Sequence, residues 1–100
     1  IVDKEISLHD EFDRFIMLVE RIVDIALAAK YMGKALIYLE AGSGALHAVS
    51  TEIISAVKQA CDLPILVGGG LKTPACLEKA YAAGANLCVV GTAFENQINL

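Results

Sequence analysis

Three short segments of the sequence place glycine where a backbone could approach an anion. They are Gly42-Ser43-Gly44, Gly68-Gly69-Gly70 and Gly91-Thr92, and each follows an apolar run. Glycine lets backbone N–H groups come close to a phosphate, and the N-terminus of a following helix adds free donors and a partial positive charge. The alternative is that these glycines only form tight turns between strands and helices. The segments predict a phosphate-binding site made of Gly42, Ser43, Gly44, Gly69, Gly70, Gly91 and Thr92.

Tyr38 and Glu40 come directly before the first of these segments. Alternate side chains of a strand point to the same face, so Tyr38 and Glu40 share one face while Ile37 and Leu39 point to the other. A phenol and a carboxylate in this place could hold sugar or glycerol hydroxyls, and Glu40 could accept a proton from one of them. We predict that Tyr38 and Glu40 are the catalytic pair. The alternative is a buried glutamate that is balanced by a lysine or by backbone N–H groups.

Motifs of several other chemistries are absent from the sequence. No G-x-G-x-x-G follows a predicted strand, and the residue before Lys72 is leucine rather than the glycine of a P-loop. Cys61, Cys76 and Cys88 form no C-x-x-C pair, which argues against a zinc site or a disulfide framework. We therefore expect no metal ligands here, and we expect the cysteines to be small core residues, Cys88 most clearly. His47 is expected to be a surface loop residue.

Helices are predicted from apolar spacing and from capping residues. Apolar side chains three and four residues apart predict a helix from about Asp10 to Met32, and Gly33 should close it in a left-handed conformation. Ser50 is a typical N-cap, and Thr73-Pro74 is an N-cap followed by proline at the first helical position. We expect a helix after each of them and a last one over residues 94–100.

Strands are predicted at 35–39, 65–67 and 87–90, where short apolar runs are bounded by glycine or proline. Their alternation with helices predicts an α/β fold with a parallel sheet, in which ligands bind at the carboxyl edge. Two architectures fit: a piece of an open doubly wound sheet, or the C-terminal part of a (β/α)8 barrel. A complete barrel needs about 250 residues, so a chain of this length would hold at most half of one.

The chain has 100 residues, of which 56% are hydrophobic, and a formal net charge of −4. This composition predicts one compact domain over 1–100. The order of elements divides it into a helical region over 1–33 and a βαβαβα phosphate-binding portion over 34–100, and if the fold is a barrel, this domain is a partial one. The acidic balance argues against nucleic acid as a partner. No apolar stretch is long enough for a membrane span, and the first residues show no secretory signal, so we expect a cytoplasmic protein.

Three segments also have a recognisable order and spacing: Tyr38-Leu39-Glu40-Ala41-Gly42-Ser43-Gly44-Ala45, Val67-Gly68-Gly69-Gly70 and Val89-Val90-Gly91-Thr92-Ala93. In these segments the chain resembles the geranylgeranylglyceryl phosphate synthase family and its bacterial heptaprenylglyceryl relatives. The similarity runs from about Ile22 to Glu95. The first segment is specific to the family, whereas the other two occur in many phosphate-binding barrels.

The resemblance implies a TIM-barrel prenyltransferase that joins a prenyl diphosphate to sn-glycerol 1-phosphate, with Mg²⁺ on the diphosphate. It implies that Tyr38 and Glu40 hold the glycerol moiety, that Glu40 accepts the hydroxyl proton, and that the glycine segments of strands six to eight form the phosphate cup. The family's magnesium-binding aspartate, on its first strand, has no counterpart in this sequence, and residues 1–20 do not resemble the family. A homo-oligomer is also expected.

We therefore expect this chain alone to bind sn-glycerol 1-phosphate weakly and to transfer no prenyl group. Two other functions remain open from the sequence. One is a different phosphate-sugar barrel, such as an isomerase or a lyase. The other is a non-catalytic α/β module whose open sheet edges pair with another copy of the chain.

Overall fold

Residues 8–42 and 47–90 are described by the computed structural model of the chain. Their order of elements is α1 (Leu8–Tyr31), β1 (Ile37–Glu40), α2 (Thr51–Cys61), β2 (Ile65–Gly68), α3 (Pro74–Ala83) and β3 (Leu87–Val89). The predicted alternation of helix and strand is confirmed within these ranges, and element boundaries differ from the predicted ones by at most two residues. The helix predicted over 94–100 lies outside the described residues.

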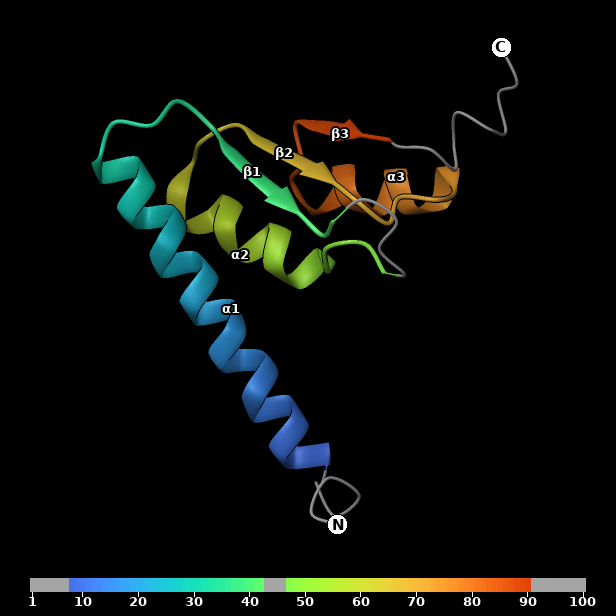
Figure 1. Ribbon diagram of the computed structural model, residues 1–100, viewed down its shortest axis with the longest axis horizontal. Coiled ribbons are helices and arrows are strands. Elements are labelled where there is room, and N and C mark those ends of the chain that lie inside the picture. The colour runs from blue at the N-terminus through green and yellow to red at the C-terminus, as the bar shows by residue number, and fades with distance from the viewer. Residues whose placement is uncertain (1–7, 43–46, 91–100) are drawn as a thin grey trace.

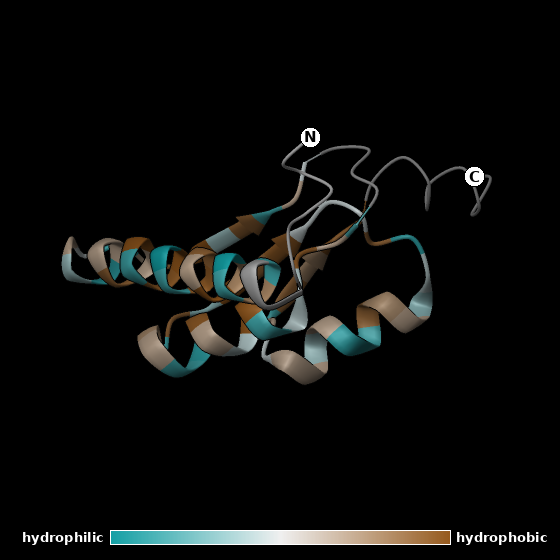
Figure 2. Ribbon diagram, turned by 90° about the horizontal axis from the view of Figure 1, so that it is seen from below, coloured by the Kyte–Doolittle hydropathy of each residue, from teal (hydrophilic) through white to brown (hydrophobic). Residues whose placement is uncertain are grey.

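The three strands form one parallel sheet in the order β1-β2-β3. Figures 1 and 2 show α2 and α3 on one face of this sheet, with α1 alongside α2 and reaching beyond the sheet. Each strand is connected to the next through a helix, as parallel strands require. The α/β class with a parallel sheet is therefore confirmed.

Local capping residues fix where the helices begin and end. After α1, Gly33 has φ +81°, and the Lys34 N–H donates to the Ala29 carbonyl at 3.0 Å, so the helix closes in a Schellman motif. The Ser50 and Thr73 side chains each accept a backbone N–H in the first turn of α2 and α3. These short-range signals were all predicted from the sequence.

The core lies between the sheet and α2. Its fully buried side chains are Ile54, Val57 and Cys61 from α2 and Ile65 and Val67 from β2. The expectation that Cys88 is the clearest core cysteine is wrong, because Cys61 is fully buried whereas Cys88 is only partly covered. Cys88 lies on β3, which is at an edge of the sheet within the described residues, and this position leaves it fewer neighbours.

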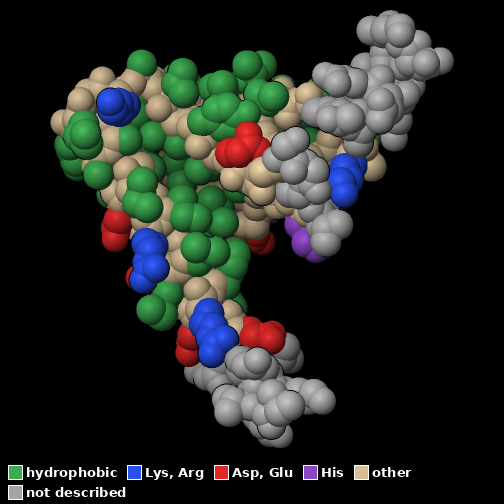
Figure 3. Space-filling view, in the orientation of Figure 1, with side chains coloured by type: hydrophobic (Ala, Val, Ile, Leu, Met, Phe, Trp, Pro, Cys, Tyr) green, Lys and Arg blue, Asp and Glu red, His purple; other side chains and the backbone are tan. Residues whose placement is uncertain are grey.

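The other face of the sheet is exposed in the described part of the chain. Tyr38 on β1 is 46% exposed, and Leu87 and Val89 on β3 are 53% and 41% exposed. Figure 3 shows hydrophobic side chains gathered on this side of the molecule, over the strands. The predicted division of the first strand between two faces is confirmed: Ile37 and Leu39 point to the helices, whereas Tyr38 and Glu40 lie on the exposed face.

Asn86 joins three elements at the amino edge of the sheet. Its side-chain oxygen accepts hydrogen bonds from the Ile65 N–H at 2.9 Å and from Lys58 Nζ at 2.8 Å. Its backbone N–H donates to the Ile65 carbonyl at 2.8 Å. Asn86 thus ties the end of α2 and the start of β3 to the start of β2.

Replacing Asn86 by alanine should lower the free energy of unfolding by about 1 to 3 kcal/mol, because a partly buried N–H and an ammonium lose their acceptor. Asn86→Asp is the matched control, since its carboxylate can accept both hydrogen bonds and should retain most of the stability. Urea denaturation of the two variants measures the difference. Equal losses of the free energy of unfolding in Asn86→Ala and Asn86→Asp would show that the Asn86 side-chain oxygen does not contribute to stability as an acceptor.

Candidate functional site

The carboxyl edge of the sheet brings Glu40 and Gly68 together. The two residues are partners in the parallel register of β1 and β2, and the Ala41 N–H continues the pairing by donating to the Gly68 carbonyl at 2.9 Å. Tyr38 and Glu40 lie on the face that the helices leave exposed, with Leu66 and Gly68 beside them on β2. The predicted catalytic pair and the second glycine segment are therefore neighbours.

The Glu40 carboxylate interacts with both the first glycine segment and Tyr38. One carboxylate oxygen, Oε1, accepts the Gly42 N–H at 2.9 Å. A hydrogen bond with the Glu40 carboxylate raises the pKa of the Tyr38 phenol above its ordinary value, and partial desolvation and the Glu40 charge raise it further. Glu40 thus joins the phenol on its own strand to the first backbone N–H of the glycine segment.

Gly69 and Gly70 both need to be glycine in this arrangement. They have φ values of +84° and +71°, a region that residues with a side chain rarely adopt. A Cβ on Gly69 would lie 2.6 Å from Glu40 Oε1 and 2.7 Å from the Gly42 nitrogen. A Cβ on Gly70 would lie 2.5 to 2.6 Å from backbone atoms of His47 and Ala48. The second glycine segment therefore packs directly against the chain that follows β1.

The structure brings together five of the nine predicted site residues: Tyr38, Glu40, Gly42, Gly69 and Gly70. The other four, Ser43, Gly44, Gly91 and Thr92, lie outside the described residues. Sequence reasoning missed that Gly68 lies against the side chains of Tyr38 and Glu40. This position of Gly68 follows from the register of β1 and β2, which places Glu40 directly opposite it and which the sequence alone does not give. His47 is exposed, as expected.

A model of the PcrB family matches residues 14–100 of the sequence. The chain belongs to this family. The matched range includes most of α1 and all the later elements, and with them the carboxyl edge described above.

Similar proteins of this family are named geranylgeranylglyceryl phosphate synthase. The one from Zunongwangia profunda is 54% identical over 78 residues, which cover 78% of this chain and 33% of that protein. The one from Thermoplasma volcanium is 43% identical over 94 residues, which cover 94% of this chain and 35% of that protein. The chain therefore spans about a third of the length of these curated relatives.

Solved structures of the family share the fold of this chain. The synthase from Thermoplasma acidophilum, in complex with its substrate sn-glycerol-1-phosphate, aligns with a TM-score of 0.76 and 41% identity over 80% of this chain and 32% of that one. The wild-type enzyme from Thermoplasma volcanium aligns with a TM-score of 0.74 and 43% identity over 81% of this chain and 32% of that one.

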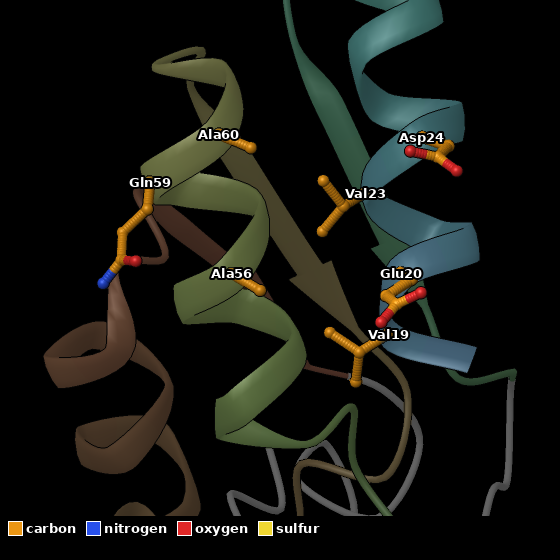
Figure 4. Close-up of a pocket in the computed structure, with 7 residues that line it drawn as sticks. All are labelled: Val19, Glu20, Val23, Asp24, Ala56, Gln59 and Ala60. Atoms are coloured by element: carbon orange, nitrogen blue, oxygen red, sulfur yellow. The ribbon is translucent and has the colours of Figure 1, made fainter. Parts of the chain in front are cut away.

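A separate groove of about 510 Å³ lies between α1 and α2. Figure 4 shows Val19 and Val23 pointing from α1 toward α2, where Ala56 and Ala60 face them, and carboxylates of Glu20 and Asp24 on the α1 side. No residue lining this groove belongs to the carboxyl edge of the sheet.

None of the described helices combines the length and the apolar character needed to cross a bilayer.

Cys76 should be the most reactive of the three cysteines. Hydrogen bonds with the Thr73 side chain and with the Lys72 backbone lower the pKa of its thiol, whereas burial raises the pKa of the Cys88 thiol. Cys61 is fully buried. We expect iodoacetamide at neutral pH to modify Cys76 first, because the thiolate is the nucleophile. Peptide mapping over time gives the order, and faster modification of Cys88 would contradict the prediction.

Proposed function

We propose that this chain carries the glycerol-phosphate-binding part of a prenyltransferase, which joins a prenyl diphosphate to sn-glycerol 1-phosphate in ether lipid synthesis. The observation that carries the proposal is the Tyr38–Glu40 pair beside Gly69 at the carboxyl edge of the sheet. It occurs in a chain that is 41% identical to a synthase whose structure holds sn-glycerol-1-phosphate. Ligands of parallel α/β sheets bind at this edge.

Tyr38 and Glu40 would hold the hydroxyl groups of the glycerol moiety. The phosphate would lie against the glycine segments, with Gly42, Ser43, Gly44, Gly69, Gly70, Gly91 and Thr92 as its cup. The Gly42 N–H already donates to Glu40, which keeps the carboxylate at the entrance of the first segment. This hydrogen bond supports a role for Glu40 in orienting both the glycerol hydroxyl group and the first glycine segment, which would hold the phosphate.

The reaction forms one C–O bond and breaks another. The glycerol hydroxyl oxygen bonds to the first carbon of the prenyl chain, and diphosphate leaves with the electron pair of its own C–O bond. Glu40 would accept the hydroxyl proton, which makes the oxygen a better nucleophile. The transfer is therefore balanced without an oxidant or a reductant.

Mg²⁺ would neutralise charge on the leaving diphosphate. Within residues 8–42 and 47–90 no three His, Cys, Asp or Glu side chains lie close enough together to hold a metal ion. The residues described do not fit a magnesium site, so we assign no ligand and no step to the metal.

We further propose that β1, β2 and β3 correspond to strands six to eight of a (β/α)8 barrel. The exposed face with Tyr38 and Val89 would then be part of the barrel interior, which explains why apolar side chains cover it. A homo-oligomer and a cytoplasmic location remain predictions that rest on the family resemblance and on the composition.

A titration followed by ¹⁵N NMR tests the proposed function. We expect sn-glycerol 1-phosphate to shift the amide signals of Gly69 and Gly70 with an affinity of about 1 mM. The enantiomer, sn-glycerol 3-phosphate, is the matched control and should bind more weakly. Shifts with a phosphoribosyl compound alone would favour the isomerase or lyase alternative. The absence of any shift with all these ligands would favour a non-catalytic module.

A further inference from the structure

Gly68 is the glycine of the second segment whose backbone does not itself require glycine. Its φ lies outside the left-handed range, unlike those of Gly69 and Gly70, so alanine is compatible with the backbone there. It is the last residue of β2, where a side chain would ordinarily favour the strand. Another reason must explain glycine at this position.

The reason is the space that Tyr38 and Glu40 occupy. A Cβ on Gly68 would lie 2.7 Å from the Tyr38 hydroxyl oxygen, 3.0 Å from Glu40 Oε2 and 3.2 Å from Tyr38 Cε1. All three atoms belong to side chains of β1. The side chains of the pair therefore cross from β1 onto β2 and lie where the side chain of residue 68 would be.

The register explains why both side chains reach this point. Glu40 is directly opposite Gly68, and Tyr38 is opposite Leu66, which makes Tyr38 the diagonal neighbour of Gly68. Diagonal neighbours on one face of a sheet are within reach of a tyrosine ring. Gly68 is the position at which the directly opposite and the diagonal side chain meet.

We propose that Gly68 is a positioning residue for the glycerol site: its missing side chain leaves the space on β2 in which Tyr38 and Glu40 lie against each other. Gly69 extends this space, since a Cβ on Gly69 would lie 2.6 Å from the other oxygen of the Glu40 carboxylate, Oε1. The Glu40 carboxylate thus lies over the backbone of two consecutive glycines. This inference rests on the proposed function for its role in substrate binding, but the placement of the pair can be tested without substrate.

The first test is Gly68→Ala, with tyrosine labelled at ¹³Cζ. The chain has three tyrosines, so the Tyr38 signal can be assigned by comparison with Tyr38→Phe. In the wild type the hydrogen bond to Glu40 raises the pKa of Tyr38. We expect Gly68→Ala to separate the pair and to lower this pKa toward the ordinary tyrosine value. Leu87→Ala, on the same face but two strands from β1, is the control and should leave the titration unchanged.

A double-mutant cycle keeps the test decisive if the alanine variant is unstable. Tyr38→Phe removes the oxygen that lies closest to the new Cβ. The factor by which Gly68→Ala reduces the folding equilibrium constant should therefore be smaller in the Tyr38→Phe background than in the wild type, by about threefold or more. Equal effects in both backgrounds, or an unchanged Tyr38 titration in Gly68→Ala, would overturn the inference.

Titration with sn-glycerol 1-phosphate separates the inference from the proposed function. If both hold, Gly68→Ala weakens binding about tenfold or more, which is the loss expected when a hydrogen-bonding pair is displaced. If the wild type does not bind but Gly68→Ala still lowers the Tyr38 pKa, the positioning role stands and the proposed function fails. If the wild type binds and Gly68→Ala changes neither affinity nor titration, the positioning role fails alone.

Discussion

Replacing Gly70 by alanine will lower the free energy of unfolding by about 2 to 5 kcal/mol, the sum of a backbone and a packing contribution. The backbone contribution arises because alanine resists the φ of +71°. The packing contribution arises because the new Cβ would lie 2.5 Å from the His47 carbonyl carbon and 2.6 Å from the Ala48 nitrogen. These are backbone atoms and cannot turn aside as a side chain can, so one of the two segments must move.

Gly33→Ala is the matched control for this prediction. Gly33 has a similar positive φ of +81°, but nothing lies within 4 Å of its added Cβ. The control should therefore lose only the backbone contribution, about 1 to 2 kcal/mol. Urea denaturation of both variants measures the difference. Equal losses would mean that the contact between Gly70 and residues 47–48 does not contribute to stability.

Replacing Glu40 by glutamine is expected to lower the rate of prenyl transfer by about 10² to 10⁴-fold, the usual contribution of a general base. The amide oxygen of glutamine can still accept the Gly42 N–H, so the glycine segment should keep its place. Glutamine cannot accept the proton of the glycerol hydroxyl. We therefore expect kcat to fall while KM for sn-glycerol 1-phosphate changes little.

This measurement needs a complete catalytic site. A chimera supplies one, in which residues 14–100 of this chain replace the matching part of the Thermoplasma volcanium synthase, with which the chain is 43% identical over 94 residues. Glu78→Gln, an exposed change of the same kind on α3, is the control and should leave kcat unaltered. An unchanged kcat in Glu40→Gln would exclude Glu40 as the proton acceptor.

Features encoded by neighbouring residues were predictable from the sequence. The Gly33 cap, the Ser50 cap and the Thr73-Pro74 helix start depend on hydrogen bonds that span at most five residues. The same holds for the shared face of Tyr38 and Glu40, which follows from strand geometry alone. The sequence therefore predicted the order of elements and the shared orientation of Tyr38 and Glu40.

Contacts between distant segments were not predictable in the same way. The bond between Asn86 and Lys58 joins residues 28 positions apart, and no local pattern distinguishes Asn86 from a surface asparagine. The contact between Gly68 and Tyr38 depends on the register of two strands, which the sequence leaves open.

The strand order has a consequence for how the chain forms during synthesis. Each strand pairs with the next strand along the chain, so the sheet in the order β1-β2-β3 grows in the same direction in which the ribosome extends the polypeptide. Once α2 and β2 have emerged, they can dock onto β1 before α3 and β3 exist. The second glycine segment can then meet Glu40 at this early stage, so the carboxyl edge of β1 and β2 can form while the nascent chain is still growing.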